Sequence, residues 1–273
     1  MQFSSHPSLQ VNIDKRKKRN LELLLKISKF CEENNLFYSL YFGTALGAVR
    51  DKKIIEWDAD IDIIINLETY QKLLANFPKN IINNDNTKNY CYQFPRFVDS
   101  YDETEPNSSF IDLFILVESD FDKINKYSKS KFNKLRAFKG YFKNYRKFYT
   151  HKYIQNLIVS FVKIFLFWVK PLTIEEAHKQ IQTTKQTELY FIVHWPNSKE
   201  KLINDHIILK KDIQEVVKIE LNGYMFNIIK NMEFYLEKIY GSSWKIPIRT
   251  DNFVFYGYYE MGKKQSDKKI NNK

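Results

Sequence analysis

The sequence predicts an α/β fold, in which helices flank a mixed sheet. Short apolar runs with the composition of strands alternate with segments of helical periodicity, and a glycine-containing turn joins the first strand to a short helix. At 273 residues and 44% apolar content, the chain is long enough to bury a sizeable core. Only 7 glycines and 7 prolines argue against a loop-built or low-complexity protein.

The N-terminal third carries the most informative pattern. Residues 1–13 are expected to form a loose arm, and Asp14–Asn35 has apolar residues at helical spacing. Leu36–Phe42 is apolar and rich in aromatics, which favours a strand. Thr44–Arg50 is then expected as a short helix, and Trp57–Ile65 as a second strand that carries acids.

A phosphate site is expected where the short helix begins. Gly43 allows the backbone to turn sharply, and the hydroxyl of Thr44 is expected to cap the helix. The first N–H groups of a helix have no acceptor within the helix and attract anions.

The acids that follow predict a metal site. Side chains alternate along a strand, so Asp58, Asp60 and Asp62 should share one face and Ala59 should point to the other. Three like charges repel, and buried charges must be paired or must bind a metal. Carboxylate oxygens suit Mg²⁺ or Mn²⁺. The alternative is an edge of acids that are solvated or are paired with Arg and Lys.

One more acid lies inside an apolar run. Asp112 interrupts the predicted strand Phe110–Leu116, where it is expected either to have a functional role or to pair with a buried Arg or Lys. The remaining predicted elements are a helix capped by Asn66 and ending near Pro78, a polar loop at 79–89, a strand at Tyr90–Val98, a loop at Ser100–Ser109, a helix at Ile174–Glu188, a short apolar stretch at Leu189–Trp195, a hairpin at Glu215–Ile229 turning at Asn222-Gly223, a helix at Asn231–Tyr240 closed by Gly241, and a polar tail at Gly262–Lys273.

The net charge of +11 is concentrated in one segment. Residues 123–152 contain 11 Lys or Arg and no acid, with aromatics between them, a mixture compatible with RNA or with anionic lipid. Ile154–Val169 is apolar but, at 16 residues, short for a membrane span. It is expected either as a buried core helix or as a helix lying on a membrane surface.

The cysteines and histidines suggest no further site. Cys31 and Cys91 form neither a disulfide framework nor a zinc motif, and Cys31 is expected in the core. The five histidines are scattered and are assigned no metal. The N-terminus has no apolar core of the signal-peptide type, so a cytoplasmic protein is expected, peripheral on the inner face of the membrane if Ile154–Val169 is interfacial.

The stretch FGTALGAVRDKKIIEWDADIDI resembles the signature of the LicD family, which includes fukutin-like proteins. Asp112 looks like the acid of a later family motif, and residues 215–247 resemble the family's C-terminal pattern. Three departures are notable: Ala59 replaces an acid, Glu56 replaces a proline before Trp57, and Asp51 stands where a His is common.

The resemblance implies a nucleotidyltransferase-like core with helical and C-terminal appendages. It implies transfer of phosphocholine, or a related alcohol phosphate, from a CDP-linked donor such as CDP-choline to a cell-surface glycan. Asp60, Asp62 and Asp112 would be the catalytic and metal-binding acids. The substrate-binding residues would be Gly43, Thr44, Arg50 and Asp58.

The resemblance and the charge pattern together divide the chain. A catalytic core is expected at 14–120, a basic and apolar segment at 121–172, and a C-terminal region packing on the core at 173–261, with residues 1–13 and 262–273 flexible. The alternatives are a nucleotidyltransferase acting on RNA or a small molecule, and a non-catalytic protein that binds membrane or nucleic acid. Nucleic acid is the partner expected least.

Overall fold

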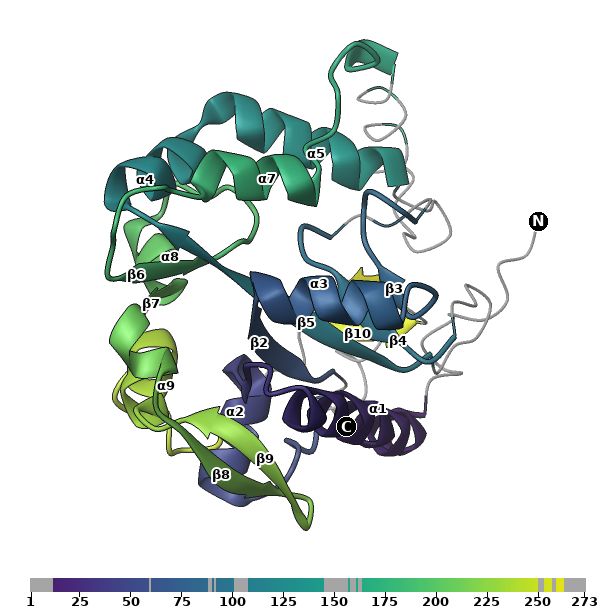
Figure 1. Ribbon diagram of the computed structural model, residues 1–273. Helices are drawn as coiled ribbons and strands as arrows, with labels where there is room; N and C mark the ends of the chain where they lie inside the picture. Colours follow the sequence, from purple (N-terminus) through teal and green to yellow (C-terminus); the bar gives the residue numbers. More distant parts are fainter. Residues whose placement is uncertain are drawn as a thin grey trace, which may run out of the picture.

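The computed structural model describes residues 12–58, 60–87, 90, 92–100, 108–144, 157, 161, 164–249, 253–256 and 259–262. Within them the predicted α/β class is confirmed, because helices flank a curled mixed sheet (Figure 1). The expectations for residues 1–11, for Ala59 and Cys91, and for residues 263–273 lie outside the described part of the chain.

The main sheet is organised around β5, a strand that reaches from one end of the sheet to the other. The described strands, in the order of their pairing, are β1 (Tyr38–Leu40), β2 (Asp62–Asn66), β5 (Phe110–Ser119), β4 (Arg96–Val98) and β3 (Ile81–Ile82), with β6 (Leu189–Ile192) beside the end of β5 and β7 (Ile207–Leu209) beside β6. Only the β2–β5 pair is parallel among these. Every residue of β5 from Phe110 to Val117 is buried, which explains its continuous apolar sequence.

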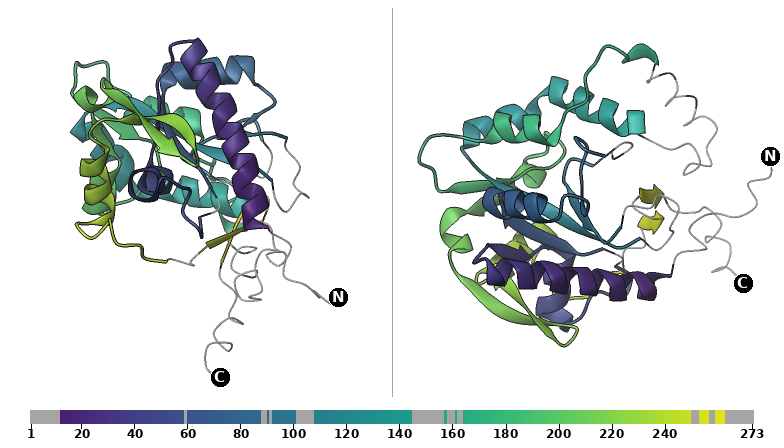
Figure 2. Two further views of the ribbon diagram at one scale, coloured as in Figure 1. Left: turned by 90° about the horizontal axis from the view of Figure 1, so that it is seen from below. Right: turned by 45° about the vertical axis from the view of Figure 1, so that its right-hand side comes forward.

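Helices cover the sheet on both sides (Figures 1 and 2). The described helices are α1 (Ile13–Glu33), α2 (Phe42–Asp51), α3 (Leu67–Asn76), α4 (Phe121–Lys129), α5 (Lys131–Asn144), α7 (Ile174–Ile181), α8 (Glu200–Asp205), the 3₁₀ helix η3 (Lys210–Ile213) and α9 (Met232–Tyr240). The long helix α1 buries Leu24, Ile27 and Cys31 in the core, as expected for Cys31. Asn66 caps α3 as predicted, accepting a hydrogen bond from the Thr69 amide.

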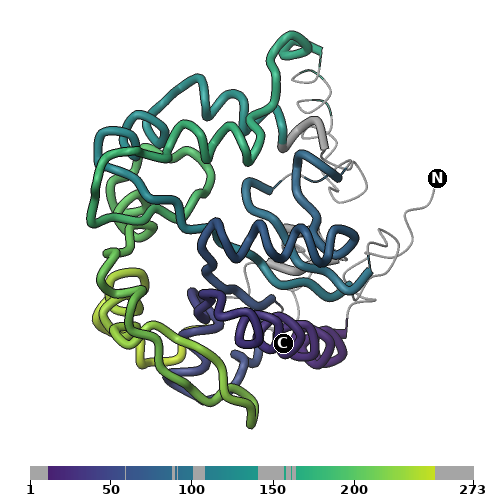
Figure 3. Tube along the Cα trace, viewed as in Figure 1, coloured from purple at the N-terminus to yellow at the C-terminus, as the bar shows by residue number. Residues whose placement is uncertain are grey.

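The C-terminal region returns to the N-terminal part of the chain. The predicted hairpin is confirmed as β8 (Val216–Leu221) and β9 (Tyr224–Ile229), with Asn222 and Gly223 both at positive φ in the turn. The Ile229 amide donates to Ser39 Oγ on β1 at 3.0 Å. Helix α9 then lies beside α2, although the two are far apart in sequence (Figure 3). A second hairpin is formed by β10 (Phe253–Tyr256) and β11 (Tyr259–Gly262).

Several predicted boundaries are wrong, and two of the errors fall near the acids. Helix α2 begins at Phe42, not Thr44, and β2 begins at Asp62, not Trp57. Phe42 itself has a positive φ of 42°, so the chain turns one residue before the glycine. The strand predicted from Tyr90 is confined to β4, and the helix predicted from Ile174 ends at Ile181. Local composition indicates that a helix or strand is present, but it does not determine the residue at which hydrogen bonding between strands begins.

Candidate metal and phosphate site

The sheet register aligns three charged side chains in one row. Across the sheet Arg96 of β4 is paired with Asp112 of β5, and Asp112 is paired with Asp62 of β2. Residues directly opposite one another on neighbouring strands project to the same face. The row therefore places one cation and two carboxylates side by side on that face.

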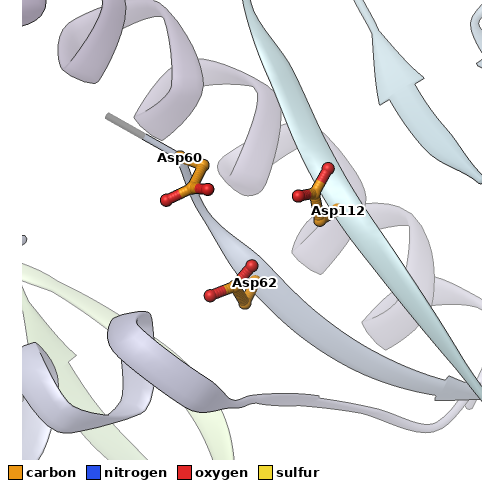
Figure 4. A group of neighbouring side chains, drawn as sticks. All are labelled: Asp60, Asp62 and Asp112. Carbon is orange, nitrogen blue, oxygen red and sulfur yellow. The ribbon is translucent and has the colours of Figure 1, made fainter. Parts of the chain in front are cut away.

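Asp60 completes the cluster from the segment that leads into β2. Carboxylate oxygens of Asp60, Asp62 and Asp112 lie within 4.8 Å of one another, and the three side chains converge on a common space (Figure 4). Asp60 does not reach this position by strand alternation, because the residues before Asp62 are not in a strand. The sequence thus predicted the convergence but gave the wrong local geometry for it.

The cluster carries more negative charge than its surroundings balance. Burial raises the pKa of Asp60 well above its ordinary value, and neighbouring Asp58 raises it further. Burial likewise raises the pKa of Asp62 well above the usual range, with added repulsion from Asp60 and Asp112. Such shifts arise where carboxylates share a site that holds too few cations. A divalent cation in the shared space would offset the repulsion among these carboxylates.

Arg96 is the cation that the cluster does contain, and the sequence analysis did not assign it to the site. It is buried, with Nε 2.5 Å from Asp112 Oδ1 and Nη2 3.2 Å from Asp112 Oδ2. The rings of Phe110 and Tyr92 lie 4.0 and 4.2 Å from its guanidinium carbon. The pKa of Asp112 is about 6, because burial raises it and Arg96 only partly offsets that effect.

One of the two expectations for Asp112, the ion pair with a buried Arg, is confirmed, and its place in a metal site stays a prediction. It pairs with a buried arginine, and it also lies among the clustered acids. One guanidinium faces three carboxylates, so pairing with Arg96 does not neutralise Asp60 and Asp62. An arginine inside a predicted strand, close in sequence to a buried acid, was the available signal.

Gly43 brings the start of α2 against the acids. A Cβ at this position would lie 2.6 Å from Asp58 Oδ2 and 3.8 Å from Asp62 Oδ2, so a larger residue would force the Asp58 carboxylate to shift. The first intrahelical hydrogen bond runs from the Ala45 amide to the Tyr41 carbonyl. The amides of Phe42, Gly43 and Thr44 therefore precede the helical ladder, in the position that binds anions.

The expectation that Thr44 caps the helix is wrong. Tyr41 is the N-cap residue and makes no side-chain cap, because the helix begins earlier than predicted. Thr44 is buried instead, and its Oγ1 accepts a hydrogen bond from the Asp62 amide at 2.8 Å. This contact fixes the start of β2, and with it the Asp62 carboxylate, against α2.

Arg50 and Asp58 line the same cavity as the cluster. Arg50 also forms a two-pronged ion pair with Asp51, with Nη2 2.6 Å from Oδ2. An ion pair was the alternative considered for Arg50. Asp58 shares a hydrogen bond with Asp60, which adds a further carboxylate to the edge of the cluster.

The cavity that contains these groups has a volume of about 820 Å³, and its lining includes eight Phe, Tyr or Trp residues. Trp57, Trp195 and Trp244 all line it, which is 3 of the 4 tryptophans in the chain. Tyr240, at the end of α9, also lines it, and the pKa of its hydroxyl is raised by burial and by the nearby acids Asp62 and Asp58. Because three distant parts of the chain supply these rings, the sequence did not reveal that they meet.

Two histidines line the cavity as a pair. The rings of His194 and His206 are 4.8 Å apart, and His206 Nδ1 lies 2.6 Å from the Leu202 carbonyl. Burial lowers the pKa of His194 to about 3, and His206 lowers it further. Burial lowers the pKa of His206 as well. Both rings are therefore neutral at neutral pH, and no histidine belongs to the acidic cluster found among the described residues.

Comparison with known proteins supports the resemblance to the LicD family over part of the chain. Residues 35–121 match the family model described as LicD/FKTN/FKRP, nucleotidyltransferase domain. The matched range contains the start of α2 and all three clustered acids. The chain is also similar to the lipopolysaccharide cholinephosphotransferase LicD of Haemophilus influenzae, at 39% identity over 54 residues. That match spans 20% of this chain and 20% of the relative, so the two are comparable over about a fifth of their lengths.

Proposed function

We propose that this chain, whose residues 35–121 belong to the LicD/FKTN/FKRP nucleotidyltransferase domain family, is a glycan-modifying phosphotransferase. It would move phosphocholine, or a related alcohol phosphate, from a CDP-linked donor to a sugar hydroxyl. The acceptor would be a surface glycan such as lipopolysaccharide, teichoic acid or capsule. The similar Haemophilus influenzae protein is named as a lipopolysaccharide cholinephosphotransferase, which supports this substrate class.

The observation that carries the proposal is the convergence of three carboxylates beside the start of a helix. Oxygens of Asp60, Asp62 and Asp112 within 4.8 Å of one another suit a hard divalent cation, Mg²⁺ or Mn²⁺. The excess of acids over Arg96 fits such an ion, because a cation would relieve the repulsion that raises the acids' pKa values. When bound, the cation would supply charge neutralisation for the transferred phosphoryl group.

Other residues of the chain would bind the donor, position Asp112 and accept a proton. The amides of Gly43 and Thr44 would hold phosphate oxygens of the donor at the start of α2. Arg96 holds Asp112 in place through two hydrogen bonds. Asp112, with a pKa of about 6, would be mostly ionised at neutral pH and so able to accept the proton of the sugar hydroxyl. Arg50 would contact a donor phosphate, in exchange for part of its pairing with Asp51.

The aromatic lining suits a quaternary ammonium group. The faces of tryptophan and tyrosine rings attract such cations, and Trp57, Trp244 and Tyr240 line the cavity that holds the acids. Choline in a CDP-linked donor carries that group. We therefore favour phosphocholine over an uncharged polyol phosphate as the transferred group.

A nucleotidyltransferase is the second candidate, since the family model is itself described by that domain. The two reactions release different products. The full chain would be incubated with Mg²⁺, an isolated surface glycan and either CDP-choline or nucleoside triphosphates. We expect CMP from CDP-choline, with phosphocholine on the glycan. Pyrophosphate from a triphosphate would instead support the second candidate.

Substitution of the acids tests the site. Asp60→Asn and Asp62→Asn are expected to lower turnover by about 100-fold or more, because each removes an oxygen donor from the cluster. Asp122→Asn is the matched control, since Asp122 is an exposed acid in the first turn of α4. Turnover that is unchanged in both cluster variants would contradict the proposed catalytic site.

A further inference from the structure

An exposed apolar face lies far from the cavity in sequence and takes no part in the proposed chemistry. It consists of six large side chains that are between 52% and 80% exposed: Leu157, Phe161, Ile164, Phe165, Phe167 and Trp168. We refer to these six side chains as the apolar face. Single exposed apolar residues are common on soluble proteins, but six within twelve positions are not.

The spacing of these residues places most of them together. Residues 157, 161, 164 and 165 are helical, and Leu157, Phe161 and Phe165 follow one another at intervals of four, which lie on one side of a helix. The rings of Phe161 and Phe165 are stacked with their centroids 4.0 Å apart. The helical residues are followed by a turn that carries Phe167 and Trp168.

The segment that carries the apolar face is anchored to the fold by the residues that follow it, 169–172. Immediately after it, Val169 and Leu172 are buried. Arg136 of α5 donates from Nε to the Lys170 carbonyl at 2.9 Å and from Nη2 to the Pro171 carbonyl at 3.0 Å. The described residues that precede residue 169 project beyond α5 in two views (Figures 1 and 2). The exposed rings are therefore presented to the outside by an anchored segment.

The charge of the surrounding sequence indicates the kind of surface that such a face would bind. From Lys123 to Ile174 the sequence contains 13 Lys or Arg and no Asp or Glu. Among the described residues of this range, Lys170 is exposed and closely follows the apolar face in sequence, whereas the exposed Lys126, Lys129 and Lys131 belong to α4 and the start of α5, away from the face (Figure 1). Rings and aliphatic side chains that penetrate the headgroup layer, flanked by lysines, are the features of a segment that binds anionic lipid.

The segment would lie on a bilayer, not cross it. None of the described helices has the length and apolar character needed for a membrane span.

The face also has a physical connection to the cavity wall. The Leu172 carbonyl accepts a hydrogen bond from Gln93 Nε2 at 3.3 Å, and the neighbours of Gln93 on either side, Tyr92 and Phe94, line the cavity.

We propose that the apolar face, with Lys170 beside it and the basic, acid-free sequence that contains it, docks this protein on the surface of an anionic bilayer. Docking would hold the cavity near acceptors that are attached to lipid. The proposal goes beyond the proposed function and does not depend on it, because membrane binding is measured without donor, acceptor or metal.

The direct test is sedimentation of the full chain with vesicles. Vesicles of phosphatidylcholine alone are compared with vesicles that also contain phosphatidylglycerol. We expect binding to the anionic vesicles at low salt, weaker binding at high salt, and little binding to phosphatidylcholine alone. Absence of binding to the anionic vesicles at low salt would overturn the proposal.

Two variants assign the binding to this face. The triple variant Phe161→Ser, Phe165→Ser and Trp168→Ser is expected to lower the vesicle partition coefficient by at least about tenfold. The matched control replaces three exposed side chains of the β8–β9 hairpin: Val217→Ser, Tyr224→Ser and Met225→Ser. Equal loss of binding in the two variants would contradict the assignment.

Two other ways of covering the face would give different experimental results. If a second copy of the chain covered it, light scattering without lipid would show a dimer that the face variant converts to a monomer. If it packed within the fold, the face variant would lower the urea midpoint of unfolding much more than the control does. We expect neither, and either result would overturn docking on a bilayer.

Discussion

Substitution of Asp62 is expected to make the metal-free protein more stable, in contrast to substitution of Asp112. Asp62 faces other carboxylates, whereas Asp112 is hydrogen-bonded to the buried guanidinium of Arg96. Asp62→Asn removes repulsion. Asp112→Asn leaves a buried positive charge without its main partner, which costs about 3 to 5 kcal/mol in comparable cases.

The size of the gain follows from the spacing of the cluster. Two unit charges at 4.8 Å, the upper limit between ligand oxygens here, repel by about 3 kcal/mol at an effective dielectric constant of 20 and by about 1 kcal/mol in bulk water. The cavity admits solvent and Arg96 attracts Asp62, so we expect Asp62→Asn to raise the free energy of unfolding by about 1 to 2 kcal/mol at pH 8.

The pH dependence provides an internal check. The folded-state pKa of Asp62 is raised, so the folded protein retains a proton that the unfolded chain has already lost. Stability therefore falls as the pH rises from the unfolded value near 4 through the raised folded value. The advantage of Asp62→Asn should appear over that rise and should shrink as the pH is lowered, because the native carboxyl becomes protonated.

The assay is equilibrium unfolding in urea, in chelator, at pH 5 and pH 8, for the wild type and both variants. The free energies of unfolding are compared at each pH. If Asp62→Asn destabilised the metal-free protein at pH 8 by as much as Asp112→Asn does, the repulsion argument would be refuted.

Three further predictions concern the same site. Mg²⁺ or Mn²⁺ should raise the melting temperature of the wild type more at pH 8 than at pH 5, because protons compete with the metal for the carboxylates. Thermal melts of Asp62→Asn should show little of this effect. Gly43→Ala should weaken Mn²⁺ binding measured by calorimetry, since its Cβ would meet Asp58 Oδ2 at 2.6 Å, while Ala45→Gly in the same helix should not. Thr44→Val should cost about 1 to 3 kcal/mol in urea unfolding, because the buried Asp62 amide loses its acceptor, whereas Thr44→Ser should largely restore stability.

The core of the candidate site was accessible from the sequence because each of its parts is easy to recognise in the chain. The Gly43 turn, the acids before and within β2, and the acid inside the apolar β5 each stand out from their neighbours. Their meeting in space follows from one parallel pair, β2–β5, in which Asp62 lies opposite Asp112.

The parts that sequence reasoning missed depend on long-range pairing. Arg96 reaches Asp112 only because the three-residue strand β4 pairs with the start of β5, a register that local composition does not specify. Trp195 and Trp244 enter the cavity from segments more than 80 residues after β5 began. The early start of α2 also escaped prediction, because it requires Phe42 to adopt a positive φ that its residue type disfavours.

The most direct measurement is a crystal structure of the full chain grown with Mn²⁺, with anomalous scattering recorded to locate the ion. We predict an anomalous peak in the space shared by Asp60, Asp62 and Asp112, with an oxygen of each acid as a ligand. No peak there at saturating Mn²⁺, with Asp112 bound to Arg96 alone and the other two acids turned to solvent, would contradict this account.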